Sequence, residues 1–423
     1  MTYIKEFCSF IDQTPTPMHF CQKAREELVN KGFVELKETE VWDNIPNKFF
    51  VVRDERAIAA FNMHDNSKAL IVATHNDSPC FRGKPNTYLQ HCGLDQARIA
   101  PYGLGQWYTW FDRDLKIAGR ILYKDGDSIK SKLFQSPEAV AIIPSLAIHL
   151  NRDLSTATNF NLEDDIMPVL SLAEGKSDSN QSPALLKAIA SSAGIEVDNI
   201  VDFDVYFVDC QGPVILGTDQ ELLSSPRLDD QSCAITALRA FIDAPDPVEG
   251  SNIFLSFDAE EIGSRLRTGA NSNFFTNILD ALEVPQSFNS NSFIISADNC
   301  HANHPNYPSK NDRSHPIYLG DGVAYSWRAN NSFATDTSSL NKLNKTIQDE
   351  CLKILKPAVT RNDSPGGRTI GPILSTQLGI ETVDLGIPVL GMHSIHETCA
   401  VKDIETLLKY FKDFYNHLSI KKD

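Results

Sequence analysis

The chain has 423 residues and a formal net charge of −16, with 42% hydrophobic and 22% charged residues. This length predicts two domains, one inserted in the other, because a single core rarely grows beyond about 250–300 residues. The negative charge argues against a nucleic-acid partner and an anionic membrane surface. No run of about 18 apolar residues occurs, so no membrane span is predicted.

The first residues and the cysteines indicate a cytoplasmic protein. The sequence MTYIKEFCSFIDQ lacks the apolar core and small-residue cleavage site of a signal peptide. Nine cysteines are scattered without a CxxC pair, which favours reduced, mostly buried thiols over a disulfide framework or a zinc–thiolate site.

The predicted elements change in character twice along the chain. The first part contains a helix over 18–31, strands over 49–52 and 57–61, and a buried strand within 68–80. Short strand-like runs follow, and a polar loop is predicted over 171–183. The last part predicts a helix over 232–242, strands over 252–257 and 292–297, a glycine-rich turn and short helix over 364–379, a strand pair over 381–394, and an amphipathic helix over 404–418.

These elements predict an α/β fold with a mixed sheet flanked by helices. The α/β domain would comprise residues 1–85 and 221–423, and a β-rich domain of residues 86–220 would be inserted in it.

The segment 258–265, Asp-Ala-Glu-Glu-Ile-Gly-Ser-Arg, follows the apolar strand 252–257. Adjacent carboxylates at a strand end are costly to desolvate, so packing alone would not select them. One glutamate could hold a metal while its neighbour acts as a base. The alternative for such a pair taken alone is a solvated acidic turn.

Five possible metal ligands lie at or near predicted strand ends, where side chains of neighbouring strands converge. Two imidazoles and three carboxylates suit Zn²⁺, Mn²⁺ or Co²⁺. A bridging Asp229 would allow the five to hold two ions about 3.5 Å apart. The five residues are His75, Asp229, Glu261, Asp298 and His393.

Two neighbouring carboxylates fit supporting roles. Asp77 could orient the imidazole of His75, and Glu260 could move a proton from water to a leaving amine. Each residue taken singly also has an ordinary structural interpretation, such as a turn, a core histidine or, for Asp230, a helix N-cap.

Seven motifs together resemble the aspartyl aminopeptidases, the M18 family of dinuclear zinc metallopeptidases. The resemblance extends from about residue 14 to the C-terminal helix. The motifs are THNDSP (74–79), WYTWFDRDLKIAGR (107–120), SPRLDDQS (225–232), FDAEEIGSR (257–265), SADNCHANHPNYPSK (296–310), GGRTIGPI (366–373) and MHSIHE (392–397).

The resemblance implies a zinc-exopeptidase catalytic domain and an inserted domain that makes subunit contacts, with dimers assembling into dodecamers. It places one zinc on His75 and Asp298 and the other on Glu261 and His393, with Asp229 bridging. Glu260 corresponds to the general base and Asp77 to the residue supporting the first histidine.

The resemblance further implies that His301 contacts the substrate and that His149 reaches the substrate of a neighbouring subunit. The implied reaction is removal of an N-terminal Asp or Glu from peptides by a hydroxide bridging the two zinc ions, with Glu260 returning a proton to the departing nitrogen.

Three positions depart from the family pattern. Ser326 replaces a lysine that meets the substrate, His396 replaces an arginine, and Arg368 stands where a small residue is common. Arg328, two residues after Ser326, could supply the missing cation. The alternatives are therefore an aminopeptidase of broader or non-acidic specificity and, in another class, an inactive shell-forming scaffold, which the intact set of carboxylates disfavours.

Overall fold

The computed structural model describes residues 2–155, 159–173, 175, 179–350, 352–353 and 355–420. These residues form two compact units. The first contains the described residues up to Asp77, those from Pro213 to Met392, and those from His396 onward, while the second contains Ser78–Gly212 with His393–Ile395. The predicted boundaries at 86 and 221 lie a few residues further along the chain.

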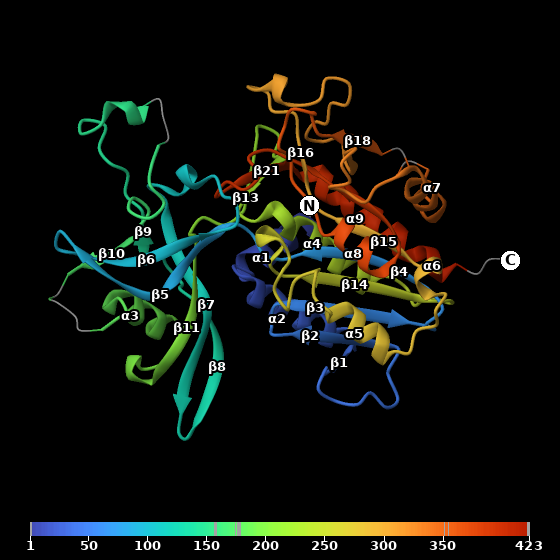
Figure 1. The fold of residues 1–423 in the computed structure, drawn as a ribbon, viewed down its shortest axis with the longest axis horizontal. Coiled ribbons are helices and arrows are strands. Elements are labelled where there is room, and N and C mark those ends of the chain that lie inside the picture. The colour runs from blue at the N-terminus through green and yellow to red at the C-terminus, as the bar shows by residue number, and fades with distance from the viewer. Residues whose placement is uncertain are drawn as a thin grey trace. The chain divides into compact units, whose positions relative to one another are not determined.

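The first unit is built on a nine-stranded mixed sheet (Figure 1). Its four central strands run parallel, and antiparallel neighbours flank them. In spatial order the strands are β1 (Val34–Leu36), β2 (Lys48–Arg53), β3 (Ala57–Met63), β14 (Ser251–Phe257), β4 (Ala69–His75), β15 (Phe293–Ala297), β19 (Glu381–Gly386), β17 (Ala324–Trp327) and β18 (Lys356–Val359).

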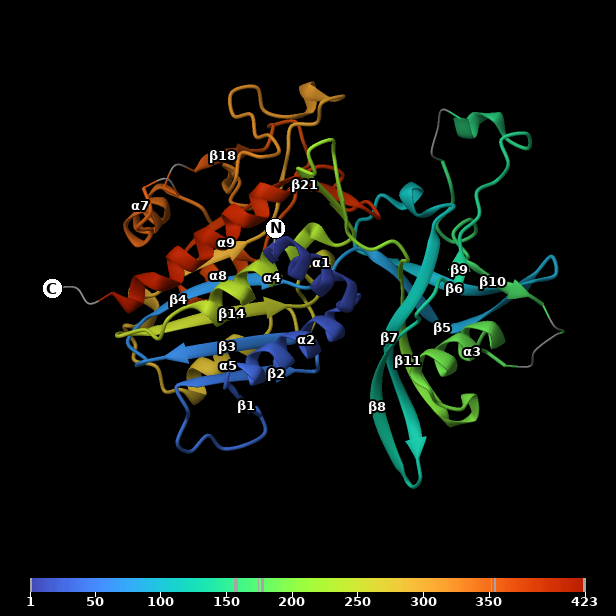
Figure 2. The same ribbon diagram turned by 180° about the vertical axis from the view of Figure 1, so that it is seen from behind.

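Helices cover both faces of this sheet because its central strands are apolar on both faces. Successive residues of β4 alternate between two cores: Leu70 and Val72 pack with one set of helices, and Ile71 and Ala73 with the other. The first set (Figure 2) is α1 (Thr2–Gln13), α2 (Pro17–Asn30), α4 (Leu228–Asp243) and α9 (Val401–Asn416). The second set is α5 (Phe274–Ala281) and α8 (Gly371–Leu378).

The second unit is a β-barrel. Its seven-stranded sheet closes through an additional pairing between β11 and β7, which removes two exposed edges. The helix α3 (Pro183–Ala193) belongs to the same unit. Its strands are β5 (Cys80–His91), β6 (Leu94–Tyr102), β7 (Asp114–Asp125), β8 (Ser128–Gln135), β9 (Ala141–Ile142), β10 (Val169–Leu172) and β11 (Ile200–Asp209).

The remaining elements of the first unit are short. One small sheet contains β12 (Val214–Leu216), β13 (Leu222–Ser225) and β21 (Glu397–Ala400). Another contains β16 (Cys300–His301) and β20 (Pro388–Val389). The short helices are α6 (Phe288–Asn291) and α7 (Thr337–Thr346). No helix among the described residues is long and apolar enough to cross a membrane.

The predicted fold class, an α/β domain with a β-rich insertion, is confirmed. One detail differs: the two strands predicted within 381–394 do not pair with each other, because β19 joins the large sheet whereas β20 pairs with β16.

Candidate metal centre

The candidate site begins where the central parallel strands end. His75 is the last residue of β4 and pairs in register with Phe257, the last residue of β14. Ser296 of the next strand, β15, pairs with Ala73, so Asp298 follows β15 at the level of His75. The carboxyl ends of three neighbouring strands thus place His75, Asp298 and the segment after Phe257 at one edge of the sheet.

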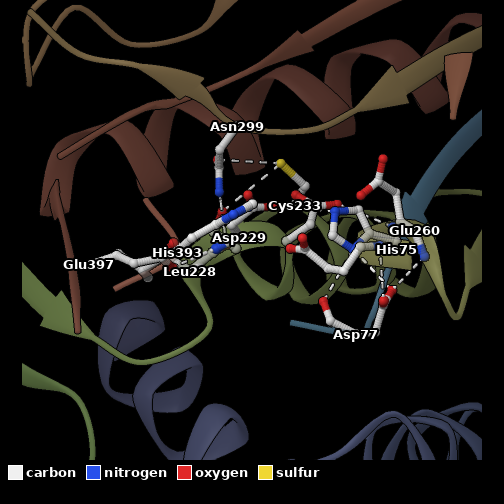
Figure 3. Close-up of polar contacts among 12 residues, drawn as sticks. His75, Asp77, Leu228, Asp229, Cys233, Glu260, Asn299, His393 and Glu397 are labelled. Atoms are coloured by element: carbon white, nitrogen blue, oxygen red, sulfur yellow. Dashed lines mark hydrogen bonds and ion pairs between the residues drawn. The ribbon is translucent and has the colours of Figure 1, made fainter. Parts of the chain in front are cut away.

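His75 lies between two carboxylates (Figure 3). Its Nε2 is 3.2 Å from Oδ1 of Asp229, and its Nδ1 is 3.3 Å from Oδ1 of Asp77. All three side chains are buried. Burial lowers the pKa of His75, but the hydrogen bonds to Asp229 and Asp77 outweigh it and raise that pKa well above its ordinary value.

Asp77 also fixes the turn that carries the adjacent glutamates. Ala259 adopts a left-handed conformation with φ of 64°, and the 3₁₀ turn Glu260–Ile262 follows it. The backbone N–H groups of Glu260 and Glu261 donate to Oδ1 and Oδ2 of Asp77, at 3.0 and 3.1 Å. One buried carboxylate therefore positions His75 and the Glu-Glu pair together.

Two groupings of nitrogen and oxygen atoms in the first unit could hold metal ions. Ligand atoms of His75, Asp229 and Asp298 lie within 4.8 Å of one another, as do those of His75, Glu260 and Glu261. The structure thus brings together four of the five predicted ligands and the predicted base.

The electrostatics of these groupings suit a cation. Burial first, and then repulsion from Asp229 and other carboxylates, raises the pKa of Asp298 well above its ordinary value. Burial is also the main cause that raises the pKa of Glu260 to about 8, with Glu261 and Asp77 contributing. Divalent cations would relieve this crowding of negative charge, and the imidazole and carboxylate donors match zinc. The residues therefore fit a zinc centre.

His393, the fifth predicted ligand, groups with the second unit. Its Nδ1 lies 2.7 Å from the carbonyl oxygen of Leu104. It follows β20 by four residues in the chain, and its role as a ligand remains a prediction.

Four further side chains support the cluster, and the sequence did not identify them as functional residues. Asp230 does not cap α4: it is buried, and its Oδ2 accepts from the backbone N–H of His75 at 3.2 Å. Glu397 accepts from the N–H of Asp229 at 2.9 Å. Asn299 donates to the carbonyl of Leu228 at 2.8 Å, and Arg56 lies 3.5 Å from Asp258. Each lies within or beside a quoted motif except Arg56, which no motif singles out.

Cys233, whose thiol contacts Asn299, is not among the metal-binding groupings. Burial, reinforced by Asp230, raises the pKa of Cys233 well above its ordinary value, so it stays a neutral thiol. The burial of Cys233 agrees with the prediction of mostly buried thiols.

The predicted substrate residues are not among the metal-binding groupings. His301 is exposed on β16, and His149 is exposed in a turn of the second unit. Ser326 is buried on β17. Arg328 donates from Nη2 and Nη1 to the carbonyls of Ser364 and Pro365, at 2.6 and 2.8 Å. His396, the other departure, has its Nδ1 3.0 Å from Oγ of Ser224.

A buried cluster of carboxylates and imidazole at the carboxyl edge of a mostly parallel sheet defines a metal-binding α/β enzyme. Comparison with known proteins identifies the kind. Residues 10–415 match the family described as aminopeptidase I zinc metalloprotease (M18). The chain is 36% identical to an aspartyl aminopeptidase of Caenorhabditis elegans, over 98% of this chain and 95% of that protein.

Solved structures agree with this match. The fold resembles a chain in the cryo-EM structure of the Ape4 and Nbr1 complex, with a TM-score of 0.92, 32% identity, and coverage of 98% of this chain and 85% of that one. It also resembles the S. cerevisiae mApe1 dodecamer, with a TM-score of 0.85, 29% identity, and coverage of 98% and 96%. The chain belongs to the M18 family and is a zinc metallo-aminopeptidase that acts on peptides.

Proposed function

We propose that this enzyme uses two zinc ions per subunit to remove an N-terminal Asp or Glu from peptides. The observation that supports this most is the buried cluster around His75, with Glu260 beside it. His75 and Asp298 would hold one ion, Glu261 and His393 the other, and Asp229 would bridge them. Mn²⁺ or Co²⁺ could occupy the same donors.

Zinc bound there would polarise the scissile carbonyl and make a water molecule more acidic. Side chains of the protein then transfer the protons. The carboxylate of Glu260 accepts a proton from the attacking water and donates it to the nitrogen of the leaving peptide. Asp77 holds the ring of His75 and the amides of Glu260 and Glu261, so the base keeps its position during the transfer. His301, and His149 from a neighbouring subunit, would contact the substrate.

The preference for Asp or Glu draws support from the name of the C. elegans relative. The second candidate function, an aminopeptidase of broader or non-acidic specificity, draws support from Ser326. This buried serine provides no positive charge where the family resemblance places a lysine.

The test compares kcat/KM of the zinc-loaded enzyme on peptides that differ only in the first residue: Asp, Glu, Ala, Leu and Lys. Higher values for Asp and Glu are expected. Equal values, or higher ones for Ala and Leu, would favour the broader specificity. A Glu260→Gln variant should lose activity while keeping its zinc, and Glu138→Gln, at an exposed glutamate, serves as the matched control.

We also propose that the chain assembles through dimers into a dodecamer. The support is the dodecameric structure of S. cerevisiae mApe1, which this chain resembles. Native mass spectrometry across a range of protein concentrations tests this directly, and a species of twelve chains is expected. A stable monomer with full activity would contradict both the assembly and the role of His149 across a subunit boundary.

A further inference from the structure

An acidic first residue needs a positive partner, and the position of Ser326 does not offer one. Tyr325, the residue before Ser326 on β17, pairs with Leu385 of β19, the residue after Asp384. Asp384 is 1% exposed, and burial raises the pKa of its carboxyl group. The residue of β19 next to that strand pair is thus a buried acid.

Arg328 does not replace the missing lysine, because its guanidinium group holds a loop. Its two terminal nitrogens donate to the carbonyls of Ser364 and Pro365. The next residue, Gly366, has a φ of 65°, and a Cβ there would overlap Nη1 of Arg328. The arginine therefore packs directly against the backbone at 364–366 and anchors one end of the loop.

Asp384 anchors the other end. Its Oδ1 accepts from the hydroxyl of Thr369 at 2.5 Å, and its Oδ2 accepts from the N–H of Ala334 at 2.5 Å. Segments 364–369 and 328–335 are thereby tied together at two points, by Arg328 and by Asp384. A loop held at both ends can present a side chain with little loss of conformational entropy.

Arg368 is the residue just before the second anchor. Its side chain is exposed and has no polar or charged partner among the residues the structure describes. The second anchor is also adjacent in the chain to a residue that contacts the metal centre: Leu385, which follows Asp384, accepts from the N–H of Asp298 at 3.0 Å. A planar guanidinium group there can take a carboxylate in two parallel hydrogen bonds.

We propose that Arg368 determines specificity by binding the carboxylate of an acidic first residue, and that Asp384, through Thr369, positions it. This inference rests on the proposed Asp or Glu preference. Two other arginines, the half-buried Arg361 and the exposed Arg265, are the natural comparisons. Arg361 lies in the same region, but its Nη2 is 2.6 Å from Asp363. Arg265 follows Glu261 by four residues and is exposed.

The experiment measures kcat and KM separately on Asp, Glu and Ala peptides, with zinc content checked for every variant. Arg368→Met should lower kcat/KM on Asp and Glu about tenfold more than on Ala, chiefly through KM, which corresponds to about 1.4 kcal/mol. Arg361→Met is the matched control and should keep the wild-type ratio. Thr369→Val should lower the ratio of kcat/KM on Asp and Glu peptides to that on Ala peptides. Thr369→Ser, which retains the hydroxyl, should keep the wild-type ratio.

Two groups of outcomes would overturn the inference, and they are distinguishable. If the wild type prefers Asp and Glu but Arg368→Met keeps that preference, or Arg265→Met removes it instead, Arg368 is not the recognition residue. If Thr369→Val and Thr369→Ser behave alike, Asp384 does not position it. A wild type without acidic preference, or without peptidase activity, would instead show that the proposed function itself fails, and the inference with it.

Discussion

Replacing Asp77 by asparagine tests whether one carboxylate organises the whole centre. Its two oxygens accept from the N–H groups of Glu260 and Glu261, and Oδ1 also faces Nδ1 of His75. The asparagine amide is neutral and offers one acceptor oxygen where the carboxylate offers two, so one N–H loses its acceptor and the other keeps only an uncharged one. A hydrogen bond to a charged group contributes about 1.5–3 kcal/mol, and we expect a loss of this size.

The loss should appear in zinc binding as well as in stability. Changing the group that orients a metal-binding histidine typically lowers affinity about 10–100-fold. Zinc affinity by competition with a chromophoric chelator, and the melting temperature with and without zinc, measure the two effects. Asp280→Asn, at an exposed position of α5, is the control. If Asp77→Asn binds zinc as tightly as the wild type, the carboxylate does not organise the site.

Three further predictions follow from the same cluster. Glu260→Gln should lower kcat about 100-fold or more at nearly unchanged KM; a loss below about tenfold in steady-state assays would argue against Glu260 as the base. Zinc binding should release protons, because the metal-free protein holds a proton on Glu260 below its pKa of about 8. The apparent affinity for zinc should therefore rise from pH 6 to 8. Calorimetry in buffers of different ionisation enthalpy measures the protons released on zinc binding, and a value of zero would refute the prediction. Gly386→Ala should weaken zinc binding, because the added Cβ would overlap the backbone carbonyl of Asp298. Gly367→Ala is the control, because a Cβ there meets nothing within 4 Å. Equal zinc affinities in the two variants would contradict the prediction.

Local sequence patterns were enough for the central strands and for the end of one short helix. Apolar runs predicted β4, β14 and β15, whose residues are buried throughout. Gly379, the last residue of the predicted glycine-rich turn and short helix over 364–379, is the C-cap of α8 with φ of 65°. These features depend on side-chain pattern and backbone conformation within a few residues, which a sequence displays directly.

Contacts between distant segments were beyond local patterns. Asp230 resembles an N-cap from its neighbours alone, yet it accepts from the backbone of His75, 155 positions earlier. The closure of the barrel depends likewise on β11 pairing with both β5 and β7. Register between strands far apart in the chain is set by the packing of the whole sheet.

Arg328 shows why a residue's function follows from its partners as well as its position. From the strand pattern it shares a face with Ser326 and offers a cation at the right distance along the chain. In the folded chain, the carbonyls of Ser364 and Pro365 accept hydrogen bonds from both terminal nitrogens of this guanidinium group. Moving it to a substrate would break these bonds and release the loop that carries Arg368. Arg368 could bind substrate without breaking such hydrogen bonds, because its side chain is exposed and the loop that carries it is held at both ends.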